Sequence, residues 1–175
     1  MKYCYTDFAF AILDYFSVIN GKEFIFEWVV PLLVAIASYF FVQNNVVVQS
    51  SSNFLSNFLS ILTNLFAILV GFTIATVAIF TTTDAKKIET LDKLSDREIR
   101  GKRIPWYRFI YVNLIYSAVA GIFMLILTLL SQLLTLVLRD EIIISILVMG
   151  ALHSLLLSLR NTTNMYFIFY EQAGR

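Results

Sequence analysis

Four polar side chains inside long apolar stretches have the types and positions to do chemistry. They are Glu27, Asn64, His153 and Arg160. A charged group at the centre of a bilayer costs at least ~2.5 kcal/mol, so an ionisable residue in an apolar segment is a functional candidate. Depth counted along the segments places Asn64 level with His153, and Glu27 level with Arg160. We therefore predict a hydrogen bond in the first pair and an ion pair in the second.

Two of these residues also have purely structural explanations. Arg160 can extend its charged group to the inner headgroups along its apolar stem. His153 can be a packing residue whose hydrogen bonds are satisfied. Proton sensing by His153 is the functional alternative, and a His153→Leu variant with unchanged behaviour would exclude it.

The sequence lacks the residues that common catalytic sites need. It has one histidine, one cysteine and no His-Glu-x-x-His motif, so no metal site of protein ligands is expected. It also has no glycine-rich phosphate loop. His153 and Ser154 are neighbours on a helix and point about 100° apart, so they do not form a nucleophile and its base. We predict that the chain is not an enzyme and that it holds no metal or cofactor. Cys4 is interpreted as a small residue without an assigned role, with S-acylation near the membrane as the alternative.

A stripe of polar and small residues recurs at steps of three and four along the second apolar segment. Its members are Asn53, Asn57, Ser60, Asn64, Ala67, Gly71, Ala75 and Ala78. The stripe must face protein or water, because an amide without a partner in hydrocarbon costs several kcal/mol. Close helix packing is the first interpretation, with the asparagines hydrogen-bonding between helices. A water-filled path lined by the asparagines is the second.

Four apolar segments position these residues. We predict membrane-spanning helices at about 24–42, 54–82, 106–138 and 142–170, each of which meets the ~20 residues that a ~30 Å hydrocarbon layer requires. The composition agrees, since 14% of the residues are charged, against about a quarter in a soluble domain. Small-residue spacing at Ser117-x-x-x-Gly121 and at Gly150-x-x-x-Ser154-x-x-x-Ser158 favours a compact arrangement. The predicted fold is all-α, a four-helix membrane bundle forming a single domain over 1–175.

Positive charge orients this domain. Seven of the thirteen Lys and Arg residues lie in the connector 83–105, between the second and third segments: Lys86, Lys87, Lys93, Arg97, Arg100, Lys102 and Arg103. Short loops rich in Lys and Arg stay on the cytoplasmic side, so we predict that the connector and both termini are cytoplasmic. These seven residues are the predicted docking surface for a soluble partner. A connector that is merely solvated is the alternative.

Two further helical elements are predicted on the cytoplasmic side. Residues 6–19 place two aspartates on one face and apolar side chains on the others, which indicates an amphipathic helix lying on the inner leaflet. In the connector, Asp84 can cap one short helix. Ser95-x-x-Glu98 has the form of a capping box before a second helix that ends at Gly101. We therefore predict a short helical loop.

The stretch 65–80 reads Leu-Phe-Ala-Ile-Leu-Val-Gly-Phe-Thr-Ile-Ala-Thr-Val-Ala-Ile-Phe. Together with the chain length, the four segments and the cytoplasmic termini, it resembles the KwaA family, the membrane subunits of the bacterial Kiwa anti-phage system. The resemblance covers the architecture of the whole chain and carries no functional residue over. It implies an oligomeric sensor of phage infection in the bacterial inner membrane, whose cytoplasmic surface holds a soluble DNA-binding effector subunit.

Two functional hypotheses follow. The first is a non-enzymatic oligomeric sensor or scaffold that anchors a soluble cytoplasmic effector protein. The second is a small ion channel or pore lined by the stripe of the second segment. The expected partners are membrane lipid, further copies of the chain and the effector. The net charge of +1 indicates no direct binding of nucleic acid.

Overall fold

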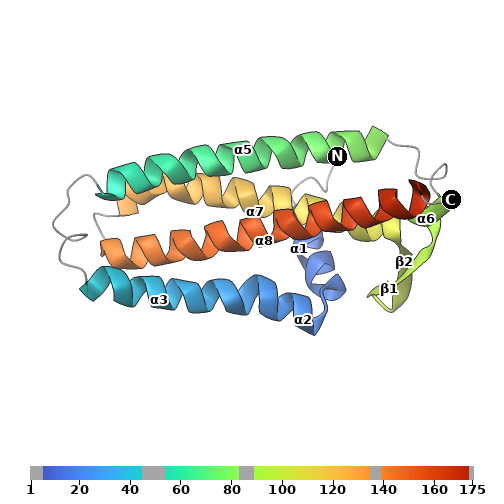
Figure 1. The fold of residues 1–175 in the computed structure, drawn as a ribbon, viewed down its shortest axis with the longest axis horizontal. Helices are drawn as coiled ribbons and strands as arrows, with labels where there is room; N and C mark the ends of the chain where they lie inside the picture. Colours follow the sequence, from blue (N-terminus) through green and yellow to red (C-terminus); the bar gives the residue numbers. More distant parts are fainter. Residues whose placement is uncertain (1–5, 45–53, 83–88, 135–138, 174–175) are drawn as a thin grey trace.

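Long helices dominate the computed structural model of the chain, which describes residues 6–44, 54–82, 89–134 and 139–173. The first helical region has three consecutive parts, α2 (Gly21–Phe24), the π turn η1 (Ile25–Val29) and α3 (Val30–Asn44). The other long helices are α5 (Phe54–Thr82), α7 (Trp106–Leu134) and α8 (Asp140–Ala173). In the described part of the chain, four helical regions are long and apolar enough to cross a membrane, as in a multi-pass membrane protein. They lie alongside one another (Figure 1).

Shorter elements gather at one end of the long helices, which we call the hairpin end (Figure 1). They are α1 (Thr6–Val18), α6 (Glu89–Asp92) and the strands β1 (Leu94–Ile99) and β2 (Lys102–Pro105). The two strands are antiparallel, with Ile99 opposite Lys102 and a bulge between Leu94 and Glu98. The opposite end, where α3 ends and α5 begins, is called the loop end.

The described part of the connector contains a β-hairpin in place of the second predicted helix. Arg100 and Gly101 form its two-residue turn, with left-handed φ angles of 52° and 74°. Such angles suit a tight hairpin turn. Ser95 is not a helix cap, because its hydroxyl donates to the Ile104 carbonyl across the hairpin at 2.7 Å. The predicted cap at Asp84 lies outside the described residues.

The helical prediction failed because the same residues that match a capping box also alternate between inward and exposed positions, as in a strand. Ser95, Arg97 and Ile99 turn toward the protein, and the residues between them are exposed. Alternation of this kind is typical of a half-buried strand. The inward face of the hairpin joins the core of the hairpin end through Ile99 and Ile104.

Two apolar clusters hold the helices together. Near the loop end, Leu62 and Phe66 of α5 pack with Met124 of α7 and Leu147 of α8. The cluster at the hairpin end joins α1, the hairpin, α7 and α8, and includes Tyr15, Val18, Ile99, Ile104, Phe109, Ile110 and Leu157. The short elements are therefore packed onto the long helices and share their core.

Two glycines allow close helix contacts. A Cβ atom on Gly121 of α7 would lie 2.9 Å from the Val70 side chain of α5. On α8, the Met124 side chain of α7 occupies the space that a Cβ of Gly150 would need. Small residues permit this kind of approach between membrane helices.

Candidate functional site

Pro31 shapes the first helical region around Glu27. In a regular α-helix the Glu27 carbonyl would accept from the N–H of residue 31, but proline has no N–H. The helix widens here into the π turn η1, in which the N–H of Val30 donates to the Ile25 carbonyl. The Glu27 carbonyl accepts from His153 of α8 instead, with Nδ1 at 2.7 Å. A single π turn inside an α-helix is frequently found at a functional site.

The Glu27 side chain is buried and has two partners. The residue is 2% exposed. The Tyr15 hydroxyl of α1 donates to Oε2 at 2.6 Å, and Arg160 Nε of α8 lies 3.0 Å from Oε1. The predicted ion pair between Glu27 and Arg160 is therefore present. The Arg160 Nε–H is not aligned for a hydrogen bond, so this contact is electrostatic.

Arg160 connects this pair to a larger ion cluster. Its Nη1 lies 3.5 Å from Glu23 Oε2, and its Nη2 donates to Asn113 Oδ1 of α7 at 2.9 Å. Glu23 also accepts a hydrogen bond from Arg97 of β1. We call the four charged residues Glu23, Glu27, Arg97 and Arg160 the ion cluster. Its two positive and two negative groups compensate each other, as charges removed from water require.

His153 forms a second connection to Glu27. A carbonyl oxygen only accepts, so Nδ1 carries the proton that it donates to Glu27. The Tyr116 hydroxyl lies 3.1 Å from Nε2 and donates to it in the neutral ring. The Tyr116 ring stacks on Tyr15 at a centroid distance of 3.6 Å. The predicted hydrogen bond between His153 and Asn64 was wrong, because Asn64 is exposed on α5; equal depth fixes a height along a helix but not the face.

Tyr15 ties α1 to this site. Its side chain is fully buried. Burial raises the pKa of its hydroxyl, and the hydrogen bond to the Glu27 carboxylate raises this pKa further. Tyr15 therefore stays protonated and remains a hydrogen-bond donor at physiological pH.

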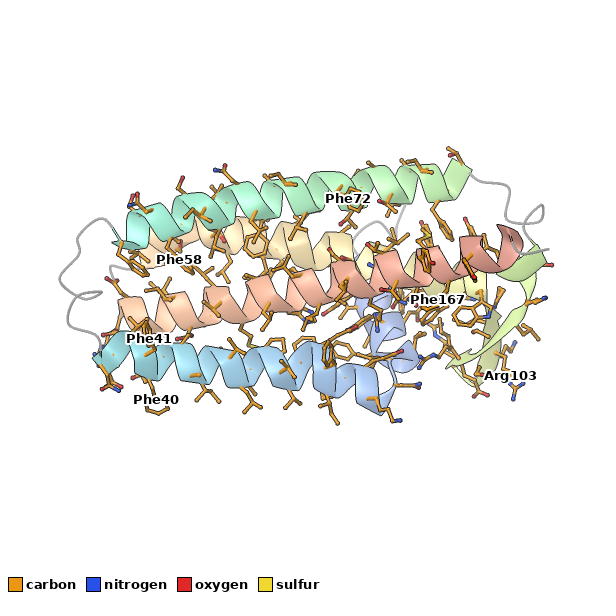
Figure 2. All side chains as sticks on the ribbon, in the orientation of Figure 1. Phe40, Phe41, Phe58, Phe72, Arg103 and Phe167 are labelled. Carbon is orange, nitrogen blue, oxygen red and sulfur yellow. The ribbon has the colours of Figure 1, made fainter. Side chains whose placement is uncertain are left out.

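The predicted docking residues that the structure describes separate into two groups. Arg97 faces the protein with a side chain that is 16% exposed, and it also donates to the Val18 carbonyl. It therefore holds the hairpin in place and does not offer its charge to a partner. Lys86 and Lys87 lie outside the described residues. The exposed members are Lys93, Arg100, Lys102 and Arg103, the last of which is labelled on the hairpin in Figure 2.

The stripe of α5 faces away from the other helices that the structure describes. Its described members are all exposed: Asn57, Ser60, Asn64, Ala67, Gly71, Ala75 and Ala78. No atom of the described residues lies within 4 Å of the position that a Cβ of Gly71 would take. Asn53 lies outside the described residues. The stripe thus does not pack against another described helix of the same chain, and a second chain or water is left to satisfy its amides.

The ion cluster holds neighbouring helices and strands together. Its arginines and carboxylates are engaged with one another, and together they join α1, β1, the first helical region, α7 and α8. Among the residues that the structure describes, no three His, Cys, Asp or Glu side chains lie close enough to hold a metal ion.

Four residues of this site were not predicted from the sequence: Tyr15, Glu23, Asn113 and Tyr116. One signal was available. A proline four positions after an intramembrane glutamate marks a carbonyl that needs a donor from another helix. The partners themselves depend on helix rotation, which the spacing of residues does not give.

No protein-family model, no curated protein and no solved structure matches the chain. The resemblance to the KwaA family therefore rests on the sequence alone.

Proposed function

We propose that the chain is a non-enzymatic membrane sensor or scaffold that anchors a soluble effector protein at its hairpin end. The ion cluster is the observation that supports this most. Arg97 of the hairpin and Arg160 of α8 share Glu23, so the hairpin is fixed to the first and fourth long helical regions. A protein bound to the hairpin would be held rigidly relative to the membrane. A loop that only joined two spans would need no such connection.

The outer face of the hairpin has the character of a protein-docking surface. Arg103 is exposed on it beside Glu98, and Arg100 and Lys102 are exposed at the turn. The nearby Leu94 is 67% exposed. Complementary charge steers association, and an apolar residue adds contact that water does not compete for. The proposed partner is therefore a soluble protein with an acidic surface patch.

The proposed orientation places the hairpin end in the cytoplasm, in agreement with the charge rule. The helix α1 then lies at the inner leaflet. Its Tyr15 and Val18 are buried in the protein core, whereas Phe10, Leu13 and Phe16 are 45%, 59% and 42% exposed. Exposed apolar side chains on an interfacial helix insert among the acyl chains.

The resemblance to the KwaA family supplies the biological setting of the proposal. In that setting the chain is a homo-oligomeric sensor of phage infection in the bacterial inner membrane, with both termini in the cytoplasm. The outward stripe of α5 supports the oligomer, because Asn57 and Asn64 need polar partners at membrane depth.

Site-specific photo-crosslinking tests the proposal in the native host. A photoreactive amino acid at Lys102 should capture one soluble protein. The same amino acid at Phe40, which is exposed near the loop end (Figure 2), should capture none. Equal capture from the two positions would overturn the proposal.

Charge variants on the same hairpin provide the matched control. Arg100→Gln combined with Arg103→Gln should lower capture at position 102 about fivefold or more, because two favourable charge contacts are lost. Asp96→Asn combined with Glu98→Gln should leave capture unchanged or raise it. If both double variants reduced capture equally, basic charge would not be what the partner recognises.

A pore is the second candidate function, favoured by the exposure of the polar half of the stripe. Because Asn57, Ser60 and Asn64 face outward, they could line a water-filled path only between several copies of the chain. Asn57→Leu combined with Asn64→Leu should then change ion leakage from liposomes while the oligomer persists. The scaffold predicts no leakage from the unaltered protein.

A further inference from the structure

A cavity of about 320 Å³ lies between α5 and α8 near the hairpin end. Leu114 of α7 and Leu91 of α6 complete its lining. Most of the wall is apolar and comes from Phe72, Ile79, Phe80 and Met165. The residues of the ion cluster do not line it.

The polar atoms of the lining are mainly hydrogen-bond acceptors. The hydroxyls of Thr73, Thr76 and Thr162 each donate to a carbonyl of their own helix, which leaves their oxygen lone pairs available. Asn161 is only 6% exposed. Its buried carboxamide oxygen has no hydrogen-bond partner among the described residues. The cavity therefore combines an apolar wall with several hydrogen-bond acceptors. The Asn161 carboxamide oxygen is the one shown to have no donor among the described residues.

We propose that this cavity binds a membrane lipid, with a hydrocarbon chain along the apolar wall and a hydroxyl or ammonium donor of the headgroup region at Asn161. The depth of Asn161 along the helices suits a donor from the headgroup region, because the neighbouring Arg160 pairs with Glu23 at the start of the first helical region. A buried acceptor without a partner destabilises the protein, and a lipid donor would remove that cost. Water is a poorer occupant, since it needs two or more polar partners and the wall is largely apolar.

Lipid retention by the purified full-length chain tests this site. The protein in detergent is equilibrated with equal amounts of phosphatidylethanolamine, phosphatidylglycerol and phosphatidylcholine that carry the same acyl chains, and then examined by native mass spectrometry. The first two lipids have headgroup donors and the third has none. We expect retained lipid to be enriched in the donor-bearing kinds by about two- to tenfold, the effect of one net hydrogen bond. Preference for phosphatidylglycerol would identify a hydroxyl donor, and preference for phosphatidylethanolamine an ammonium donor.

Variants separate this site from lipid that merely surrounds the protein. Asn161→Leu should abolish the enrichment while lipid is still retained. Thr76→Trp fills the cavity and should reduce retention itself. The matched control is Ile61→Trp, at an exposed position in the other half of α5, and it should change neither quantity. Equal retention of all three lipids by the unaltered chain, or enrichment that survives both cavity variants, would overturn the proposal.

Discussion

Glu27 holds the hairpin end together through both its side chain and its backbone. The carboxylate binds Tyr15 and Arg160, and the carbonyl accepts from His153. These partners come from α1 and α8, so a single residue of the first helical region contacts two other elements. A buried glutamate is tolerated because each of its polar groups has a partner.

Arg160→Leu should lower the free energy of unfolding by about 3–5 kcal/mol, because it leaves Glu27 without its cation in a buried site. Thermal unfolding in detergent would measure this loss. Arg139→Leu is the control, since Arg139 is 64% exposed and pairs with Glu141 near the loop end; its cost should stay within about 1 kcal/mol. The double variant with Glu27→Leu should recover part of the loss, and a double variant less stable than Arg160→Leu alone would contradict this account.

At the scale of elements, the π turn depends on Pro31 and His153 together. His153→Leu should destabilise the chain by about 1–3 kcal/mol, because it leaves the Glu27 carbonyl without a donor. In a Pro31→Ala background residue 31 regains an N–H that can bond this carbonyl, so the cost of His153→Leu should fall by about 1 kcal/mol. Unfolding of the four members of this double-mutant cycle measures the coupling. Additive losses would show that the two residues act independently.

The elements differ in how far the sequence could predict them. The four spans follow from apolar length alone, and the pairing of Glu27 with Arg160 follows from counting depth. The hairpin was missed because Ser95 and Glu98 match a helix cap as well as a strand, and only contacts with the rest of the protein decide between them. The partners of His153 depend on the rotation of α8 about its axis, which the number of residues in a segment does not specify.

At the scale of the whole molecule, the two ends differ in chemistry. The described hairpin end carries the ion cluster, α1 and the exposed basic residues Arg100, Lys102 and Arg103, whereas the described residues of the loop end include one basic side chain, Arg139. Exposed aromatic residues occur at both ends, for example Phe41 and Phe167 (Figure 2), as expected at two membrane interfaces. The asymmetry supports the proposed orientation, with the basic end inside.

Cysteine labelling should confirm this orientation. In a Cys4→Ser background, Ser56→Cys near the loop end should react with a membrane-impermeant maleimide in intact spheroplasts. Lys102→Cys on the hairpin should react only after the membrane is permeabilised, because positive loops are retained inside. Gel-shift of the labelled protein measures both reactions. Labelling of position 102 in intact cells, with or without labelling of position 56, would contradict the cytoplasmic location proposed for the hairpin.

The outward stripe makes one further prediction about the assembly. If α5 meets α5 of a second copy, Ala67→Leu should weaken self-association, because small residues allow close contact between helix backbones. Ala37→Leu is the matched control, since Ala37 is exposed on α3, away from the stripe. Mass photometry in detergent across a dilution series should show the Ala67→Leu oligomer dissociating at a roughly tenfold higher concentration, equivalent to about 1.4 kcal/mol, with the control unchanged. If the oligomers of the two variants dissociated at the same concentration, the interface would lie elsewhere. Water would then be left as the partner of the asparagines, which is the condition that a pore requires.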